Sequence, residues 1–300
     1  MNVSSILVLR GGALGDFLIT LPLLKALRKR WPGARIDLAG NSRAAELAAL
    51  DGTLSAVHDQ SELRWAELYS DGPLSTAFRS WLESFDIVLN FWPDPNGEIA
   101  RRFPLRGGQR YHASSSKVIS RPACAHFFTP LEALHLPPPR HARLTLPARF
   151  AREAASRLMP DARRVAVHPG SGSARKNWPP SRWLELIERL APDPILVILG
   201  EAEDAVRAEM TTLGSDRIQI ADTWPLPLLA CAIAACRLFV GHDTGIAHLA
   251  AACGTPCVLL FGPTDPAVWA PFAPDVTVLR DGDALENVSI DRVLQHVRWD

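Results

Sequence analysis

Short apolar runs alternate with amphipathic, helix-like segments along most of this chain. These apolar or strand-like runs lie at residues 6–9, 36–39, 55–58, 87–91, 165–168, 195–199, 238–240 and 257–261. Between them, apolar residues recur at helical spacing at residues 20–31, 43–50, 148–158, 181–190, 205–213, 228–235 and 245–252. Runs without polar alternation are typical of strands buried on both faces of a parallel sheet. The alternation therefore predicts an α/β fold with helices on both faces of a parallel sheet.

The alternation weakens between residues 93 and 147, where Pro, Gly, Ser and Arg are frequent. The segment 136–140, Leu-Pro-Pro-Pro-Arg, predicts a stiff extended connector. A chain of 300 residues is long enough for two domains of about 150 residues each. We therefore expect two Rossmann-like doubly wound domains, at residues 1–147 and 148–300. Such sheets bind ligands beyond the carboxyl ends of their strands, so we expect the domains to face each other across a substrate cleft.

The overall charge gives no reason to expect a nucleic-acid partner. The net charge is zero and the isoelectric point is about 7.1. No apolar run approaches the length of a membrane span, and residues 1–5 do not resemble a signal peptide. We therefore expect a soluble, cytoplasmic protein. Its oligomeric state stays open, with a monomer favoured. The cysteine spacing does not match a zinc site, so reduced, buried thiols are expected at Cys124, Cys231, Cys236, Cys253 and Cys257.

The stretch 238–249 holds the clearest sign of a ligand site. An apolar run ends at Gly241, a polar turn follows at residues 242–244, and an Ala-rich helical segment begins at Gly245. The first amides of a helix have no internal partner, and the helix dipole there favours negative charge. We therefore expect the diphosphate of an activated substrate to bind at this turn. His248 lies four residues after Thr244 and should face the same diphosphate ligand, although a lone histidine on such a helix can also be a core residue.

A Gly/Ser-rich loop with two cations follows the run at residues 165–168. Residues 168–179 read His-Pro-Gly-Ser-Gly-Ser-Ala-Arg-Lys-Asn-Trp-Pro. Exposed amides and hydroxyls, with Arg175 or Lys176 beside them, favour phosphate binding over a merely flexible turn. The loop is not a Walker motif, because the Gly-Lys-Ser/Thr ending is missing.

The first turn between a strand and a helix, at residues 10–17, leaves two interpretations open. Arg10 stands where the dinucleotide fingerprint requires glycine, and the carboxylate of Asp16 would repel a pyrophosphate. Asp16 can simply cap the helix. It can also be a general base in a turn whose glycines, Gly12 among them, let a substrate approach closely.

Other polar positions have both a functional and a structural interpretation. Glu201, Glu203 and Asp204 follow the run at 195–199 and could accept ribose hydroxyls or supply charge at a helix start. Trp224 could stack on a nucleobase, although a role in covering the core is favoured. A basic series could contact an anionic acceptor, although a solvated face is favoured. It comprises Arg101, Arg102, Arg106, Arg110, Lys117 and Arg121.

Three motifs together resemble glycosyltransferase family 9, the ADP-heptose:lipopolysaccharide heptosyltransferases. They are Gly-Asp at 15–16 followed by Thr-Leu-Pro at 20–22, the loop at 168–179, and Asp-Thr-Gly-x-x-His at 243–248. They occur in the family's order and span most of the chain. The resemblance implies a GT-B fold, with the acceptor in the N-terminal domain and the nucleotide sugar in the C-terminal domain. It also implies inversion at the anomeric carbon without a metal or other cofactor.

The resemblance also implies roles for individual residues. The catalytic carboxylate falls at Asp16, and the ribose-binding glutamate falls near Glu203, with Glu201 or Asp204 also allowed. The donor-binding positions are Ser171, Ser173, Lys176, Glu203, Trp224, Asp243, Thr244, Gly245 and His248. The expected acceptor contacts are Gly12, Arg101, Arg102 and Arg106.

We accordingly expect an enzyme that transfers a sugar from a nucleotide sugar. The resemblance points to heptose from ADP-heptose, moved onto a lipopolysaccharide core or related glycan at the inner face of the cytoplasmic membrane. Two alternatives stay open. One is a GT-B nucleotide-sugar epimerase, which needs no acceptor, and the other is a non-catalytic nucleotide-sugar-binding module.

Overall fold

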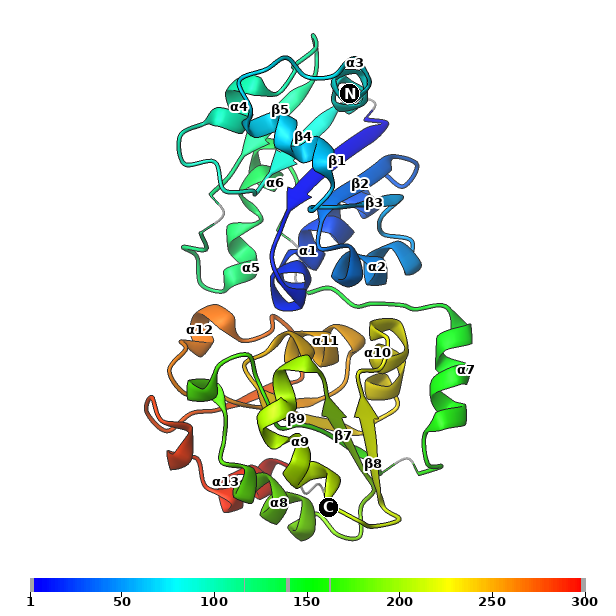
Figure 1. Cartoon of the computed structure of the whole chain (residues 1–300), viewed down its shortest axis with the longest axis vertical. Coiled ribbons are helices and arrows are strands. Elements are labelled where there is room, and N and C mark those ends of the chain that lie inside the picture. Colours follow the sequence, from blue (N-terminus) through cyan, green and yellow to red (C-terminus); the bar gives the residue numbers. More distant parts are fainter. Residues whose placement is uncertain (1–2, 116, 139–140, 162, 298–300) are drawn as a thin grey trace. The chain divides into compact units, whose positions relative to one another are not determined.

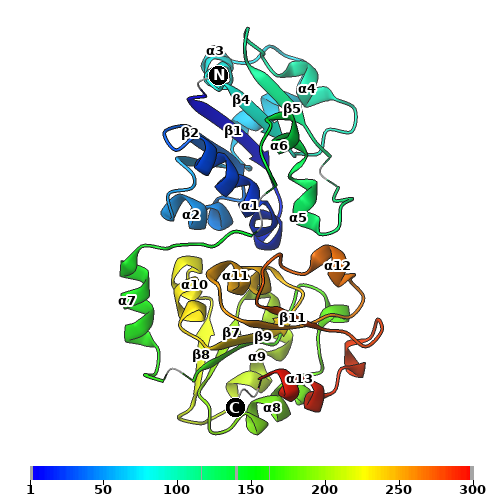
Figure 2. The same ribbon diagram turned by 180° about the vertical axis from the view of Figure 1, so that it is seen from behind.

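The computed structural model describes residues 3–115, 117–138, 141–161 and 163–297, in two compact units (Figures 1 and 2). Unit 1 is Met1–Ala142 and unit 2 is Arg143–Asp300. The division lies close to the boundary expected at residue 147. Residues 139–140 of the expected connector and residues 1–2 of the N-terminal segment lie outside the described ranges. The roles expected for the two units stay predictions.

Unit 1, coloured blue to green in Figure 1, is built on a five-stranded parallel sheet of order β3-β2-β1-β4-β5. Its strands are β1 Ser5–Arg10, β2 Arg35–Gly40, β3 Ala56–Asp59, β4 Ile87–Asn90 and β5 Arg110–Ala113. Its helices are α1 Leu14–Arg30, α2 Ser42–Leu50, η1 Leu63–Tyr69 (3-10), α3 Thr76–Glu83, α4 Glu98–Arg102, α5 Ala123–His126 and α6 Thr129–Ala133. The order reverses between β1 and β4, which creates a crevice at their carboxyl ends.

Unit 2, coloured green to red, is built on a six-stranded parallel sheet of order β11-β10-β9-β6-β7-β8. Its strands are β6 Val165–His168, β7 Ile195–Leu199, β8 Ile218–Asp222, β9 Leu238–His242, β10 Cys257–Leu260 and β11 Val276–Leu279. Its α-helices are α7 Ala148–Arg157, α8 Pro180–Arg189, α9 Asp204–Thr211, α10 Leu226–Ala234, α11 Gly245–Cys253, α12 Pro266–Trp269 and α13 Ile290–Val297. Its 3-10 helices are η2 Ala174–Lys176, η3 Glu201–Glu203 and η4 Leu285–Asn287. The order reverses between β6 and β9.

Helices cover both faces of each sheet. In unit 1, η1, α3 and α4 pack on the face that carries Leu7 and Val88, while α1 contacts α2 and α5. In unit 2, α8, α9 and α13 bury their apolar stripes against β6, β7 and β9, and α10 contacts α7 and α11. The central strands β1, β6 and β7 are buried at every position, as expected from their unbroken apolar runs. No helix in the described ranges combines the length and the apolar character needed to span a bilayer.

Three strands were not expected from the sequence, and all three lie at sheet edges. β5, β8 and β11 each leave a flank without a neighbouring strand, and most of their residues are only partly buried. Edge strands need less apolar surface, so their sequences carry polar residues and lack the continuous apolar signal.

The first helix begins earlier than the periodicity suggested. α1 starts at Leu14 rather than residue 20, because the Asp16 side chain accepts the Ala13 N–H at 3.0 Å and satisfies an amide of the first turn. Pro22 lies inside α1 and is buried.

All five cysteines are free thiols. Cys124, Cys236 and Cys257 are buried, whereas Cys231 and Cys253 are partly exposed. Burial raises the pKa of the Cys236 thiol to about 12, so it stays protonated at neutral pH. Among the described residues, no three His, Cys, Asp or Glu side chains are grouped to hold a metal ion.

Candidate functional site

Two polar segments meet at the point in unit 2 where the strand order reverses. The ends of β6 and β9 are neighbours, with His168 opposite Gly241 in the parallel register. The Gly/Ser-rich loop leaves β6 there, and the turn before α11 leaves β9. Doubly wound sheets bind ligands at this position.

The turn after β9 forms an open helix N-terminus. Thr244 is the N-cap residue of α11, and its Oγ1 accepts the Ala247 N–H at 3.4 Å. Residues 243–246 are partly exposed, while residues 247–250 are buried. Only the first turn of α11 is therefore open to a ligand, with its amides and the positive end of its dipole.

Lys176 brings a cation to this helix N-terminus from the other segment. Its Nζ lies 2.7 Å from Oδ2 of Asp243, which also accepts the Thr264 hydroxyl at 2.8 Å. The side chain of Lys176 is 30 % exposed and that of Asp243 is 11 % exposed. The structure thus brings Lys176, Asp243 and Thr244 together at the open N-terminus of α11, where the helix dipole and the Lys176 ammonium could both meet a diphosphate.

The two serines of the loop differ in what they can contact. Ser171 is buried, and its Oγ lies 2.7 Å from Oδ1 of Asn177 and 2.9 Å from the Ser173 carbonyl. Its hydroxyl therefore stabilises the loop itself. The side chain of Ser173 is exposed, so of the two it is the one placed to meet a ligand.

His242, a residue that the sequence did not single out, anchors this loop. Its Nε2 accepts the Trp178 N–H at 3.0 Å, and its ring packs edge-on against Trp183. Complete burial, with a contribution from the charge of His168, lowers the pKa of His242 to about 3, so the ring stays neutral. A histidine at the end of an apolar run gives no signal in the sequence that distinguishes this role.

His168 and Glu203 form a second buried polar pair behind the turn. Nε2 of His168 lies 3.2 Å from Oε1 of Glu203, and its Nδ1 lies 3.4 Å from Thr244 Oγ1. Burial favours a raised pKa for Glu203, but the hydrogen bond and charge of His168, helped by the Gly200 N–H at 2.7 Å, hold that pKa below its ordinary value. A Cβ at Gly170 would lie only 2.4 Å from Glu203 Cγ, so the loop needs glycine there.

The expected ribose carboxylate is therefore engaged within the protein. Glu203 is only 4 % exposed, whereas Glu201 and Asp204 are exposed. Trp224 is partly exposed beyond the end of β8, and the Arg157 guanidinium lies over its ring at 5.5 Å. His248 is 9 % exposed in the first part of α11. Their expected contacts to a nucleotide sugar stay predictions.

In unit 1, Asp16 both caps α1 and presents a carboxylate to solvent. Its Oδ2 accepts the Ala13 N–H, and its Oδ1 pairs with Arg10 Nη2, each at 3.0 Å. The Asp16 side chain is 42 % exposed, although that of Arg10 is only 7 % exposed. Gly12 has φ +108°, and a Cβ there would lie 2.6 Å from Asp16 Cβ. The Asp16 side chain can therefore cap α1 and still leave its carboxylate accessible to act as a base.

Beside Asp16 lies a pocket of about 450 Å³ at the crevice between β1 and β4. Its rim comes from the segments that follow three strands, and much of its wall is aromatic. The lining residues are Arg10, Gly11, Gly12, Gln60, Trp65, Tyr69, Phe91, Trp92 and Pro93. A pocket of this size, with flat rings and few polar groups, suits a ring-shaped ligand such as a sugar.

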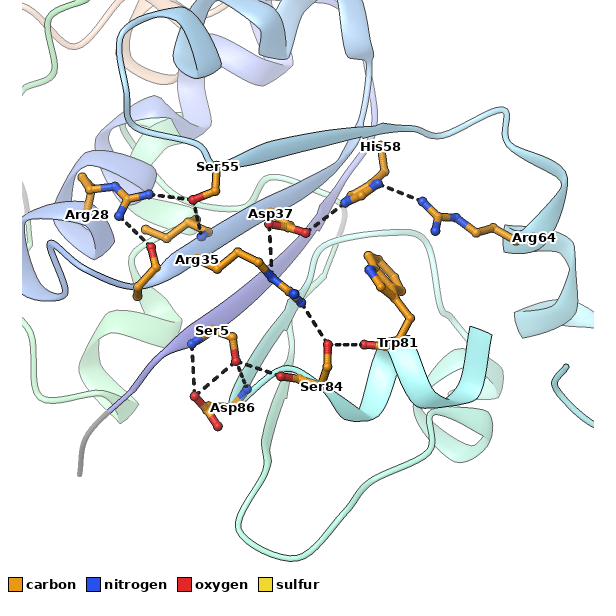
Figure 3. Close-up of polar contacts among 12 residues, drawn as sticks. Ser5, Arg28, Arg35, Asp37, Ser55, His58, Arg64, Trp81, Ser84 and Asp86 are labelled. Atoms are coloured by element: carbon orange, nitrogen blue, oxygen red, sulfur yellow. Dashed lines mark hydrogen bonds and ion pairs between the residues drawn. The ribbon is translucent and has the colours of Figure 1, made fainter. Parts of the chain in front are cut away.

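A partly buried chain of polar side chains fastens η1, which contributes Trp65 and Tyr69 to that wall (Figure 3). Asp37 Oδ2 lies 3.0 Å from His58 Nε2, and His58 Nδ1 lies 2.8 Å from Arg64 Nη2. A guanidinium only donates, so Nδ1 accepts and Nε2–H donates to Asp37. The chain links the sheet to η1.

The expected acceptor arginines do not gather at this pocket. Arg106 pairs with Asp86 at 2.8 Å, just before β4, because residues 103–109 return to the amino end of the sheet. Arg102 Nη2 donates to the Glu67 carbonyl at 3.2 Å and so braces η1. Arg101 is exposed on α4. Of the four expected acceptor contacts, Gly12 alone lines the pocket.

Comparisons with known proteins agree with the family expected from the motifs. A model of the family described as glycosyltransferase family 9 (heptosyltransferase) matches residues 117–297, more than half of the chain. Lipopolysaccharide heptosyltransferase 1 of Escherichia coli K12 is 25 % identical over 319 residues, which cover 97 % of this chain and 98 % of that protein.

Two solved structures cover nearly the whole chain. The glycosyltransferase family 9 protein of Veillonella parvula DSM 2008 matches with TM-score 0.80 and 18 % identity, over 98 % of this chain and 97 % of that one. The E. coli heptosyltransferase WaaC with ADP matches with TM-score 0.74 and 21 % identity, over 98 % of each chain. The expected GT-B fold and the expected enzyme class, a glycosyltransferase, are confirmed. The chain belongs to glycosyltransferase family 9.

Proposed function

We propose that this enzyme transfers heptose from ADP-heptose onto a lipopolysaccharide core, inverting the anomeric carbon without a metal ion. The observation that carries the proposal is the Lys176 ammonium beside the open N-terminus of α11. It supplies positive charge where a departing diphosphate needs it. The names of the relatives, with ADP bound in one solved structure, support the choice of donor and acceptor.

In the proposed donor site, the diphosphate binds the first-turn amides of α11 and Lys176. The exposed Ser173 hydroxyl adds a donor from the loop. The ribose would meet Glu201, Glu203 or Asp204 beyond β7, and the base would stack on Trp224 beyond β8. These segments all follow the carboxyl ends of neighbouring strands of one sheet.

In the proposed acceptor site, the sugar that receives the heptose lies in the aromatic pocket of unit 1. Asp16 takes the proton from the acceptor hydroxyl while the hydroxyl oxygen attacks the anomeric carbon, on the face opposite the diphosphate. The bond between that carbon and the diphosphate breaks, and Lys176 and α11 stabilise the negative charge that develops. The acceptor is lipid-linked, so the enzyme would work at the inner face of the cytoplasmic membrane.

The test is a transfer assay with ADP-heptose and lipopolysaccharide core that lacks heptose, with and without EDTA. We expect a heptosylated product of inverted anomeric configuration by NMR, at a rate that EDTA does not change. Retention of configuration or loss of activity in EDTA would overturn the mechanism. Conversion of ADP-heptose to an epimer without acceptor would favour the epimerase alternative, and binding without any turnover would favour a binding module.

A further inference from the structure

Arg10 connects the end of strand β1 to the carboxylate of Asp16. Its Nη2 lies 3.0 Å from Asp16 Oδ1 and 3.4 Å from the Asp16 carbonyl oxygen. Its side chain is only 7 % exposed, and its guanidinium lies over the Phe127 ring at 4.7 Å. Burial lowers the pKa of Arg10 and Asp16 opposes that shift, but an arginine stays charged at neutral pH. Arg10 therefore offers Asp16 a charged donor whose direction is fixed by its surroundings.

Thr20 holds Arg10 in place from the helix side. It is fully buried on α1, one turn after Asp16. Its Oγ1 accepts the Arg10 Nε–H at 3.2 Å, and its hydroxyl donates to the Asp16 carbonyl at 3.0 Å. Arg10, Asp16 and Thr20 thus form a closed set of hydrogen bonds between β1 and the beginning of α1. Thr20 belongs to the Thr-Leu-Pro part of the first motif, and the proposed transfer step gives it no part.

The Asp16 carboxylate is held on both of its oxygens. Arg10 donates to Oδ1, and the Ala13 N–H donates to Oδ2 at 3.0 Å. The carboxylate therefore cannot rotate without losing a hydrogen bond, and the one to Arg10 is charge-assisted. Each oxygen keeps a second lone pair that an acceptor hydroxyl can approach. A general base needs such an alignment, because it must lie within hydrogen-bond reach of the proton that it takes.

We propose that Arg10 and Thr20 are positioning residues, which hold the Asp16 carboxylate in the direction that it needs to take the proton from the acceptor hydroxyl. Both act through Asp16. The inference rests on the proposed function, in which Asp16 is the base. A misplacement of about 1 Å can slow a reaction by about a hundredfold, so removing one support should slow transfer without changing donor binding.

The first test measures kcat for transfer with ADP-heptose and lipopolysaccharide core that lacks heptose, both saturating, and the ADP dissociation constant by calorimetry. Arg10→Met covers the Phe127 ring but cannot donate, so it should lower kcat by about 10- to 100-fold while the ADP dissociation constant stays within about twofold. Thr20→Val loses the hydroxyl and should lower kcat by about three- to tenfold, whereas Thr20→Ser keeps it and should stay within about twofold.

Arg28→Met is the matched control for a general loss of stability in unit 1. Arg28 lies near the other end of α1, where it donates to the Thr53 and Ala34 carbonyls at 3.0 and 2.7 Å. The variant should lower the melting temperature and leave kcat unchanged. A loss of kcat as large as that of Arg10→Met would overturn the specific role of Arg10.

Chemical rescue separates positioning from folding. Arg10→Ala leaves room for a free guanidinium ion over the Phe127 ring, so millimolar guanidinium chloride should raise its kcat by about tenfold or more and leave its melting temperature unchanged. Urea has the same planar shape without the charge and should not restore kcat. Equal rescue by urea, or no rescue by guanidinium, would overturn the charge-assisted contact to Asp16.

A double variant tests whether Arg10 acts through Asp16. In the Asp16→Asn enzyme, Arg10→Met should lower kcat further by less than about threefold, because the base that Arg10 orients is already absent. A further loss as large as that of Arg10→Met alone would overturn the positioning role.

Failure of this inference differs from failure of the proposed function. If Asp16→Asn is slow but Arg10→Met and Thr20→Val keep full kcat, the positioning role is overturned and Asp16 remains the base. If Asp16→Asn keeps full turnover, the base assignment fails and the positioning role fails with it.

Discussion

Replacing Lys176 by methionine should weaken donor binding by a predictable amount. Lys176 Nζ lies 2.7 Å from Asp243 Oδ2, and the side chain stays 30 % exposed, so it can also reach a phosphate oxygen. A hydrogen bond to a charged group contributes about 1.5–3 kcal/mol. Losing it raises the dissociation constant of ADP by about 10- to 150-fold, since about 1.4 kcal/mol corresponds to tenfold.

The same change also exposes the bound diphosphate to the charge of Asp243. Without Lys176, the Asp243 carboxylate keeps the Thr264 hydroxyl as a partner but has no cation opposite it at 2.7 Å. Its repulsion adds to the loss, so Lys176→Met should lie toward the upper end of the range. Removing that charge as well, in Lys176→Met/Asp243→Asn, should recover part of the affinity.

Calorimetry with ADP is carried out on the unmodified enzyme, Lys176→Met, Asp243→Asn and the double variant. The four dissociation constants separate the loss of the Lys176 contact from the repulsion by Asp243. Arg175→Met is the matched control, because Arg175 is exposed beside Lys176. It should change affinity by less than about threefold, or about 0.7 kcal/mol. An unchanged affinity in Lys176→Met would refute the phosphate contact. A double variant as weak as or weaker than Lys176→Met would refute the repulsion by Asp243.

Four further predictions concern other residues described above. Asp16→Asn should lower kcat by about a hundredfold or more, while the ADP dissociation constant measured by calorimetry stays within about twofold; full turnover would exclude Asp16 as the base. Position 12 has φ +108°, and a Cβ there would lie 2.6 Å from Asp16 Cβ, so Gly12→Ala should lower the free energy of unfolding by about 1–3 kcal/mol in chemical denaturation. An unchanged denaturation midpoint would contradict this strain. Arg64→Ala should raise the acceptor KM but not the donor KM in steady-state kinetics, because Arg64 fastens η1 to His58. Equal effects on both KM values would contradict a role for η1 in acceptor binding. His242 has a pKa of about 3 in the folded protein, below its unfolded value, so the stability that its neutral ring contributes is present above about pH 6.5 and is lost as the pH falls toward 3. The melting temperature of His242→Gln should therefore fall less steeply with acid over this window. Identical pH profiles for the two proteins would contradict the buried, neutral state of His242.

The central strands and the turn before α11 could be predicted from local sequence. β6, β7 and β9 are unbroken apolar runs because they are buried on both faces, and Thr244 caps a helix immediately after one of them. Such features depend on neighbours within a few residues. The edge strands β5 and β8 could not be recognised, because their partial exposure admits polar residues.

The contacts that complete the site depend on pairings far apart in the chain. Nothing near His168 indicates that Glu203 lies against it, since the contact forms only when β6 and β7 are paired. Likewise, the basic series gave no sign that Arg106 returns to the amino end of the sheet, where it pairs with Asp86. Charge spacing along a loop does not determine the direction in which that loop runs.

The way η1 is fastened has a consequence for how acceptor preference can change. Trp65 and Tyr69 shape the pocket from a segment that is not a strand of the sheet and that Arg64 ties to His58. The residues of η1 can therefore be replaced, provided that Arg64 is kept, without altering the hydrogen bonds between the strands. If the proposed acceptor site is right, replacing this one short segment would change acceptor preference, while the turn at Asp16 stays as it is.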